Sequence, residues 1–137
     1  MTNRAPILLN GLTRTTVGLT ALTRPVRIIR ATGVDRVTAE KIAWLARLAG
    51  IRDLALGAGL LHAQLTGAPT RGWLFTGLLA DAADAAVFTH ATTRRQLPPA
   101  AGTAMAAAAA GGVALAATTL TRHHPTNTRT GTAAPAA

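Results

Sequence analysis

The sequence predicts an all-α integral membrane protein, a four-helix bundle that forms one domain over residues 1–120. Composition is the first reason, because 49% of the residues are hydrophobic and only 14% are charged, against roughly 25% charged in soluble domains. Length is the second, since 137 residues suit one bundle and are too few for two separate cores. The third is a series of four mainly apolar stretches of helical length, at about 6–29, 39–64, 73–91 and 100–120.

Composition also excludes several classes of function. The net charge is +9, but the chain has only two Trp, two Phe and no Tyr. Binding to nucleic acid needs a basic face with stacking aromatic side chains, so we expect no nucleic-acid partner. Without Cys or Ser the chain has no thiolate metal site and neither of these nucleophiles. His123 and His124 have no neighbouring acid or Cys, so we expect no metal site and no cofactor.

The first stretch, residues 6–29, can be placed in two ways. On a helical projection its Thr and most of its Arg side chains share one side, opposite to Gly, Val, Leu and Ile. Such a helix either lies in the headgroup plane with its Arg side chains toward anionic lipid, or spans the bilayer with its Thr face inward. Arg14 falls on the apolar side, which favours spanning if an acid lies opposite. Pro25 predicts a kink or an end near the membrane surface.

The second stretch, residues 39–64, predicts a helix of ~39 Å, long enough to cross the ~30 Å hydrocarbon layer with tilt. Thr38 is its expected N-cap. Small residues share one stripe with Asp53, so a neighbouring helix can approach closely beside this carboxylate. Arg52 points about 100° away, and we expect it to contact a different neighbour.

The last two stretches differ in their charge. Residues 73–91 place Asp81 and Asp84 on one helical face. Residues 100–120 carry no charge and have the length of a membrane crossing. The tail that follows, residues 121–137, is polar and low in complexity, which predicts disorder.

Loop charges predict the orientation. The first and third connections, with their flanks, carry seven basic residues, and the opposite side carries four. The positive-inside rule therefore places loops 30–38 and 92–98 in the cytoplasm and the C-terminus outside. We expect a multi-pass protein of the cell membrane, in contact with the lipid bilayer and of undetermined oligomeric state.

Charges inside the stretches predict a polar centre. Three Arg, Arg47 included, and three Asp lie there, and antiparallel helices share depth at residues equidistant from their connection. Counting outward from the first connection sets Arg14 beside Asp53. Counting from the second sets Arg52 level with Asp84 and within about a turn of Asp81. We expect five residues in a cavity between the first three helices: Arg14, Arg52, Asp53, Asp81 and Asp84.

Three short motifs resemble a family of small four-span integral membrane proteins, found in actinobacteria and fungi and known only as a domain of unknown function. They are R-D-L-A-L-G in the second stretch, A-D-A-A-D in the third and R-P-V-R-I-I-R-A-T-G at the end of the first. The resemblance covers about residues 8–120 and implies a four-helix membrane fold with a shared polar centre, without an established activity. The matched positions are Arg52, Asp53, Gly57, Asp81 and Asp84. The Ala-rich last helix and the Thr-rich tail depart from the pattern, so no role is implied for that end.

Three functions are open on the sequence alone. The first is an accessory, non-enzymatic membrane protein whose buried ion pairs fix helix packing or bind a lipophilic small molecule or a charged partner. The second is a cofactor-independent membrane enzyme, an isomerase or cyclase of a lipid-like or terpenoid substrate. Asp81 or Asp84 would then be the general acid, with its neighbour or His62 as the base. The third is passage of protons or small solutes along the line of Asp and Arg.

Overall fold

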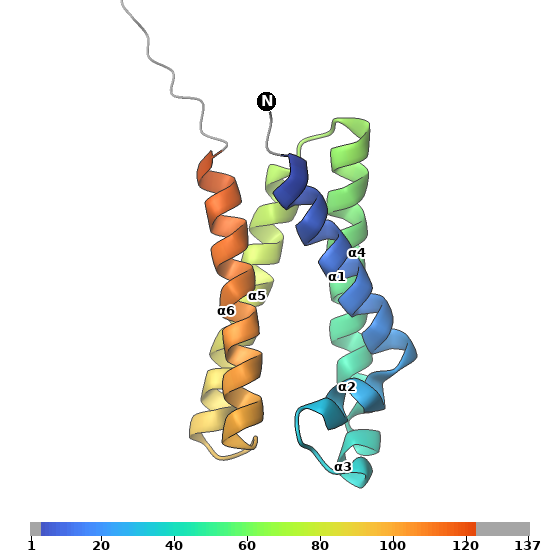
Figure 1. Cartoon of the computed structure of the whole chain (residues 1–137), viewed down its shortest axis with the longest axis vertical. Coiled ribbons are helices and arrows are strands. Elements are labelled where there is room, and N and C mark those ends of the chain that lie inside the picture. Colours follow the sequence, from blue (N-terminus) through green and yellow to red (C-terminus); the bar gives the residue numbers. More distant parts are fainter. Residues whose placement is uncertain (1–3, 123–137) are drawn as a thin grey trace, which may run out of the picture.

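The computed structural model describes residues 4–122, and the secondary structure in that range is helical throughout (Figure 1). Four long helices alternate in direction, and two short helices lie between the first and second of them. Their bounds are α1 (Arg4–Thr23), α2 (Pro25–Ala31), α3 (Arg36–Lys41), α4 (Ala43–Thr66), α5 (Arg71–Thr93) and α6 (Pro99–Arg122). The predicted tail lies outside the described residues apart from its first two positions.

The chain between α1 and α4 differs from the prediction. The first stretch is two helices, because α1 ends at Thr23 and Pro25 opens α2, where its missing N–H is tolerated. The expected N-cap at Thr38 is wrong. Asp35 caps α3 instead, and its carboxylate accepts the backbone N–H of Thr38 at 3.0 Å, the usual bond from the third helical residue to its cap. The long helix then begins at Ala43, four residues later than predicted.

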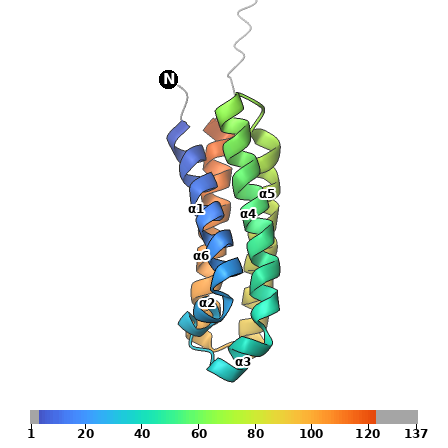
Figure 2. The ribbon, with the colours of Figure 1, turned by 90° about the vertical axis from the view of Figure 1, so that its right-hand side faces the viewer.

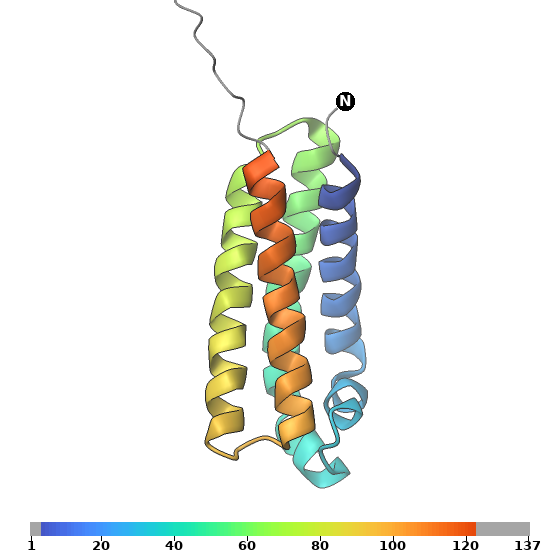
Figure 3. The same cartoon turned by 60° about the vertical axis from the view of Figure 1, so that its left-hand side comes forward.

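The long helices form two antiparallel pairs. Helix α1 packs chiefly against α4, and α5 packs chiefly against α6, whereas the two pairs meet more sparsely through α4 with α5 and α1 with α6. Figures 2 and 3 show the long helices upright, with α2, α3 and the connection from α5 to α6 all at the same end. Since α1 lies along α4, it belongs to the bundle.

Four glycines bring α1 and α4 into backbone contact. Gly11 and Gly18 of α1 face Gly57 and Gly50 of α4. A Cβ atom added at Gly18 would lie 2.5 Å from the backbone N of Leu54, and one added at Gly57 would lie 2.7 Å from the carbonyl O of Gly11. Small residues of this kind let helices approach more closely than any larger side chain allows.

Few large apolar side chains are buried inside the bundle, and many are exposed. The buried cluster is small: Ile7, Leu60 and Leu74, each 2% exposed, with Leu120 packed against it. Within residues 4–122, fourteen large apolar side chains are exposed on the outer faces. By length and composition, α6 is the described helix that is apolar enough to cross a membrane, over Pro99–Thr121 with a mean hydropathy of 1.5.

Candidate functional site

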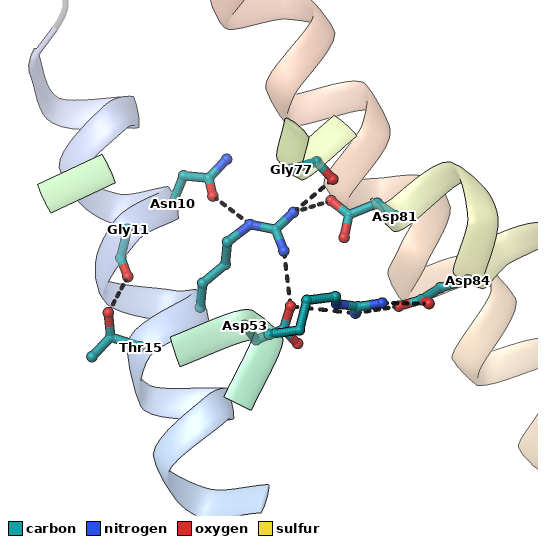
Figure 4. Close-up of polar contacts among 9 residues, drawn as sticks. Asn10, Gly11, Thr15, Asp53, Gly77, Asp81 and Asp84 are labelled. Atoms are coloured by element: carbon teal, nitrogen blue, oxygen red, sulfur yellow. Dashed lines mark hydrogen bonds and ion pairs between the residues drawn. The ribbon is translucent and has the colours of Figure 1, made fainter. Parts of the chain in front are cut away.

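Arg14 is the centre of a charged network between α1, α4 and α5, and Figure 4 labels its partners Asp53, Gly77 and Asp81. Its Nη1 donates to Asp53 Oδ1 on α4 at 3.1 Å. Its Nη2 donates to the carbonyl O of Gly77 on α5 at 3.2 Å and also to Asp81 Oδ2, one turn later. Its Nε donates to Asn10 Oδ1 at 3.2 Å, one turn earlier on α1. A single guanidinium therefore ties α1 to both α4 and α5.

Arg52 extends the network toward the other carboxylate of α5. Its two terminal nitrogens donate to the two oxygens of Asp84, at 2.8 and 2.6 Å, the parallel geometry that guanidinium and carboxylate prefer. Its Nη2 also lies 3.3 Å from Asp53 Oδ1. Because Asp53 contacts both guanidinium groups, the contacts form one chain: Asp81, Arg14, Asp53, Arg52 and Asp84.

Burial decreases along this chain. The side chains of Arg14 and Asp81 are 12% and 11% exposed, and that of Asp53 is 17% exposed. Arg52 and Asp84 are about one-third exposed, at 35% and 30%. Losing a partner at the Arg14 end therefore leaves a more strongly desolvated charge than losing one at the Arg52 end.

Two glycines make room for the network. A Cβ atom at Gly77 would lie 3.2 Å from Arg14 Nη2, and one at Gly112 would lie 2.8 Å from Asp81 Cγ. Gly112 belongs to α6, so the fourth long helix also borders the site. Gly112 and Asn10 are not among the site residues predicted from the sequence. The signals that could have found them are the amide one turn before Arg14 and a glycine pair in an otherwise Ala-rich helix.

The predicted pairings agree with these contacts, with two differences. Depth counting predicts Arg14 beside Asp53 and Arg52 beside Asp84, and both contacts are present. Asp81, which was expected within a turn of Arg52, contacts Arg14 instead. Arg52 also reaches its own neighbour Asp53, because a long guanidinium side chain can bend back across the 100° that separates their Cβ atoms.

Two other candidate residues lie apart from the network. Arg47 is exposed near the start of α4, so the balance of three Arg and three Asp becomes two against three, a net charge of −1 when all are ionised. His62 is exposed and nine residues beyond Asp53, about 13.5 Å along α4. Within residues 4–122 no group of three His, Cys, Asp or Glu side chains is placed to hold a metal ion.

No protein-family model matches the chain, and neither a curated protein nor a solved structure matches it significantly. The expected membership in a family of small four-span membrane proteins stays a prediction.

Proposed function

We propose that the chain is a small multi-pass membrane protein with an accessory, non-enzymatic role. In this proposal α1, α4, α5 and α6 cross the bilayer, and the charged network holds the two helix pairs together. The observation that carries it is the inverted distribution of side chains. Five charged side chains contact one another in the middle of the bundle, while large apolar side chains face outward.

The outer surface supports a lipid environment. Exposed apolar side chains follow each of the first three long helices, for example Leu19 of α1, Ile51 of α4 and Leu79 of α5, each more than half exposed. In water a surface of this kind favours association, whereas hydrocarbon accepts it. The two Trp residues are also exposed, Trp44 at the start of α4 and Trp73 at the start of α5. Since these helices run in opposite directions, the indole rings lie near opposite ends, as in the aromatic belts of membrane proteins.

Helix length supports the same placement. The four long helices have 20, 24, 23 and 24 residues, which is about 30–36 Å against ~30 Å of hydrocarbon. Mean hydropathy undervalues α1, α4 and α5, because it counts charges that point into the bundle. Those charges face one another, and the exposed sides of these helices carry large apolar side chains, together with several Thr residues and Arg47.

The network supports a structural role at the centre. An unpaired charge in the bilayer centre costs at least ~2.5–3.5 kcal/mol, so each guanidinium needs the carboxylate that it contacts. Because the two helix pairs meet sparsely, Arg14 with Asp81 and Arg52 with Asp84 are the main polar links between them. Their positions fix the register of α5 against α1 and α4.

The absence of Cys from the chain allows a direct test with single-Cys variants. A membrane-impermeant maleimide should label Ala31→Cys and Gln96→Cys from the cytoplasmic side and Ala68→Cys from the opposite side. Ala108→Cys, exposed in the middle of α6, should react only after detergent is added. Equal labelling of all four positions in intact vesicles, or recovery of the chain without membranes, would contradict the proposal.

The excess carboxylate favours a second function, binding or passage of a proton or another cation. With three carboxylates for two guanidinium groups, one negative charge in the network has no fixed counter-charge. Asp81→Asn should then abolish proton flux into liposomes that contain the purified chain. Flux that is unchanged by this substitution, or no flux above that of empty liposomes, argues against this function.

The enzyme hypothesis stays a prediction. Asp81 and Asp84 are both engaged by guanidinium groups, and His62 lies too far along α4 to act with them as a general base in this arrangement. An acid and base pair needs both groups within reach of one substrate.

A further inference from the structure

One end of the bundle carries positive charge that the chain itself cannot neutralise. This basic end consists of α2, α3, the start of α4 and the turn from α5 to α6, which lie at the same end of the bundle (Figures 1 and 2). Six exposed Arg side chains define it, together with Arg36 and Lys41 of α3: Arg24, Arg27, Arg30, Arg47, Arg94 and Arg95. The opposite end carries Arg4, Arg71 and Arg122.

The whole chain has five acidic residues, and two of them lie at the basic end. Three belong to the charged network in the middle of the bundle. At the basic end itself, Asp35 caps α3, and Glu40 pairs with Arg36 at 2.8 Å. Two carboxylates cannot balance the eight basic residues of this end, so most of their counter-charge comes from outside the chain.

Local geometry presents these guanidinium groups outward. Arg27 and Arg30 are three residues apart on the short helix α2 and therefore share one side of it, Arg24 is exposed at its N-cap, and Pro25 is buried. Arg95, the residue after the C-cap of α5, has φ of 56°, a conformation in which glycine is the usual residue. An Arg therefore occupies this turn although its positive φ costs more free energy than it would for glycine.

We propose that the basic end binds the headgroups of anionic phospholipids in the adjoining leaflet, an inference that rests on the proposed membrane placement. Guanidinium groups bind phosphate through paired N–H donors, and their spread over α2, α4 and the turn from α5 to α6 fits several separate headgroups better than one compact ligand. Trp44, 57% exposed at the same end, lies where an indole ring sits at the headgroup level.

Trp44 and Trp73 allow the preference for anionic over zwitterionic lipid to be measured at each end of the bundle separately. The full chain with Trp73→Phe, which leaves Trp44 as the fluorophore, is reconstituted in vesicles of phosphatidylcholine mixed with phosphatidylglycerol. In one set of vesicles the phosphatidylcholine carries brominated acyl chains, and in the other set the phosphatidylglycerol does. Bromine quenches the fluorescence of a nearby indole. The association constant at Trp44 should favour phosphatidylglycerol at least about fivefold, the effect of one Arg near an anionic surface, and high salt should remove the preference. Trp44→Phe, which reports from the other end, should show little preference.

Paired variants assign the effect to the basic end. Arg27→Gln with Arg30→Gln should reduce the preference at Trp44, whereas the matched control Arg4→Gln with Arg71→Gln should leave it intact. Phosphatidylglycerol retained by the unaltered two-Trp chain after purification from the mixed vesicles gives a second measurement that needs no Trp substitution. Equal quenching by both lipids, or an equal loss in the control variant, overturns the inference. If neither Trp is quenched by either lipid, the membrane placement itself has failed.

Discussion

Replacing Gly18 with Ala is expected to separate α1 from α4. The new Cβ would lie 2.5 Å from Leu54 N and 2.7 Å from Gly50 O. Ordinary van der Waals contact begins at 3.4 Å, so the helices must move apart locally by about 0.9 Å. Both obstacles are backbone atoms, which cannot rotate away as a side chain could. Overpacking of this kind costs ~1–3 kcal/mol, which equals or exceeds the ~1 kcal/mol that Ala gains over Gly within a helix.

Gly111→Ala is the matched control, because a Cβ atom added there meets nothing within 4 Å. Both variants gain the same helix propensity, so the difference in their free energies of unfolding isolates the clash. We expect Gly18→Ala to be less stable than Gly111→Ala by about 1–3 kcal/mol, measured by reversible denaturation in detergent micelles with circular dichroism. Equal stability of the two variants would refute the close packing of α1 on α4.

Two further predictions concern single polar contacts. Arg52→Lys replaces the two parallel hydrogen bonds to Asp84 by one point charge. It should lower the free energy of unfolding by about 0.5–1 kcal/mol, which is the low end for one hydrogen bond because both groups are one-third exposed. The control Arg47→Lys, at an exposed position, should change the free energy of unfolding little. Hydrogen bonds from the Thr38 side chain and then its backbone N–H lower the pKa of Asp35. The cap therefore stabilises α3 at pH values above the unfolded pKa of Asp, about 3.9, and this stabilisation is lost as pH falls through the lower pKa of the folded state. The chemical shift of the Thr38 amide should titrate with a midpoint below about 3.9. A midpoint at or above that value would contradict the cap.

The sequence predicts the end of α4 and both ends of α5 and α6 to within about two residues. Two of these ends coincide with strong local signals: Gly67 caps the end of α4 with φ of 73°, and Pro99 opens α6. The region between α1 and α4 was predicted less well. Helices α2 and α3 are too short for a periodic apolar pattern, and they depend on Pro25 and on the Asp35 cap, which are single-residue effects.

Within the site, depth counting predicts which backbone positions are level and says little about where long side chains end. It therefore predicts the contacts of Arg14 with Asp53 and of Arg52 with Asp84. It does not predict that Arg14 also reaches Asp81 across the bundle, because that contact depends on the approach of α5 and on the space left by Gly112 of α6. The uncharged last helix carries one sign that it borders the site, the pair Gly111 and Gly112 in an Ala-rich run.

Two features of the sequence, the spacing of the glycines and the position of a charge, set the register of α1 against α4. The segments GLTRTTVG (11–18) and GIRDLALG (50–57) have glycines at both ends and a charge at the fourth position, Arg14 in one and Asp53 in the other. In antiparallel helices this spacing sets the first glycine of each segment against the last of the other, and the two charges then lie at nearly the same depth. Sliding either helix by one turn would press a side chain against the facing backbone and separate the pair that is now 3.1 Å apart. Close packing and charge pairing therefore select the same register, so α1 and α4 present Arg14 and Arg52 together to the carboxylates of α5.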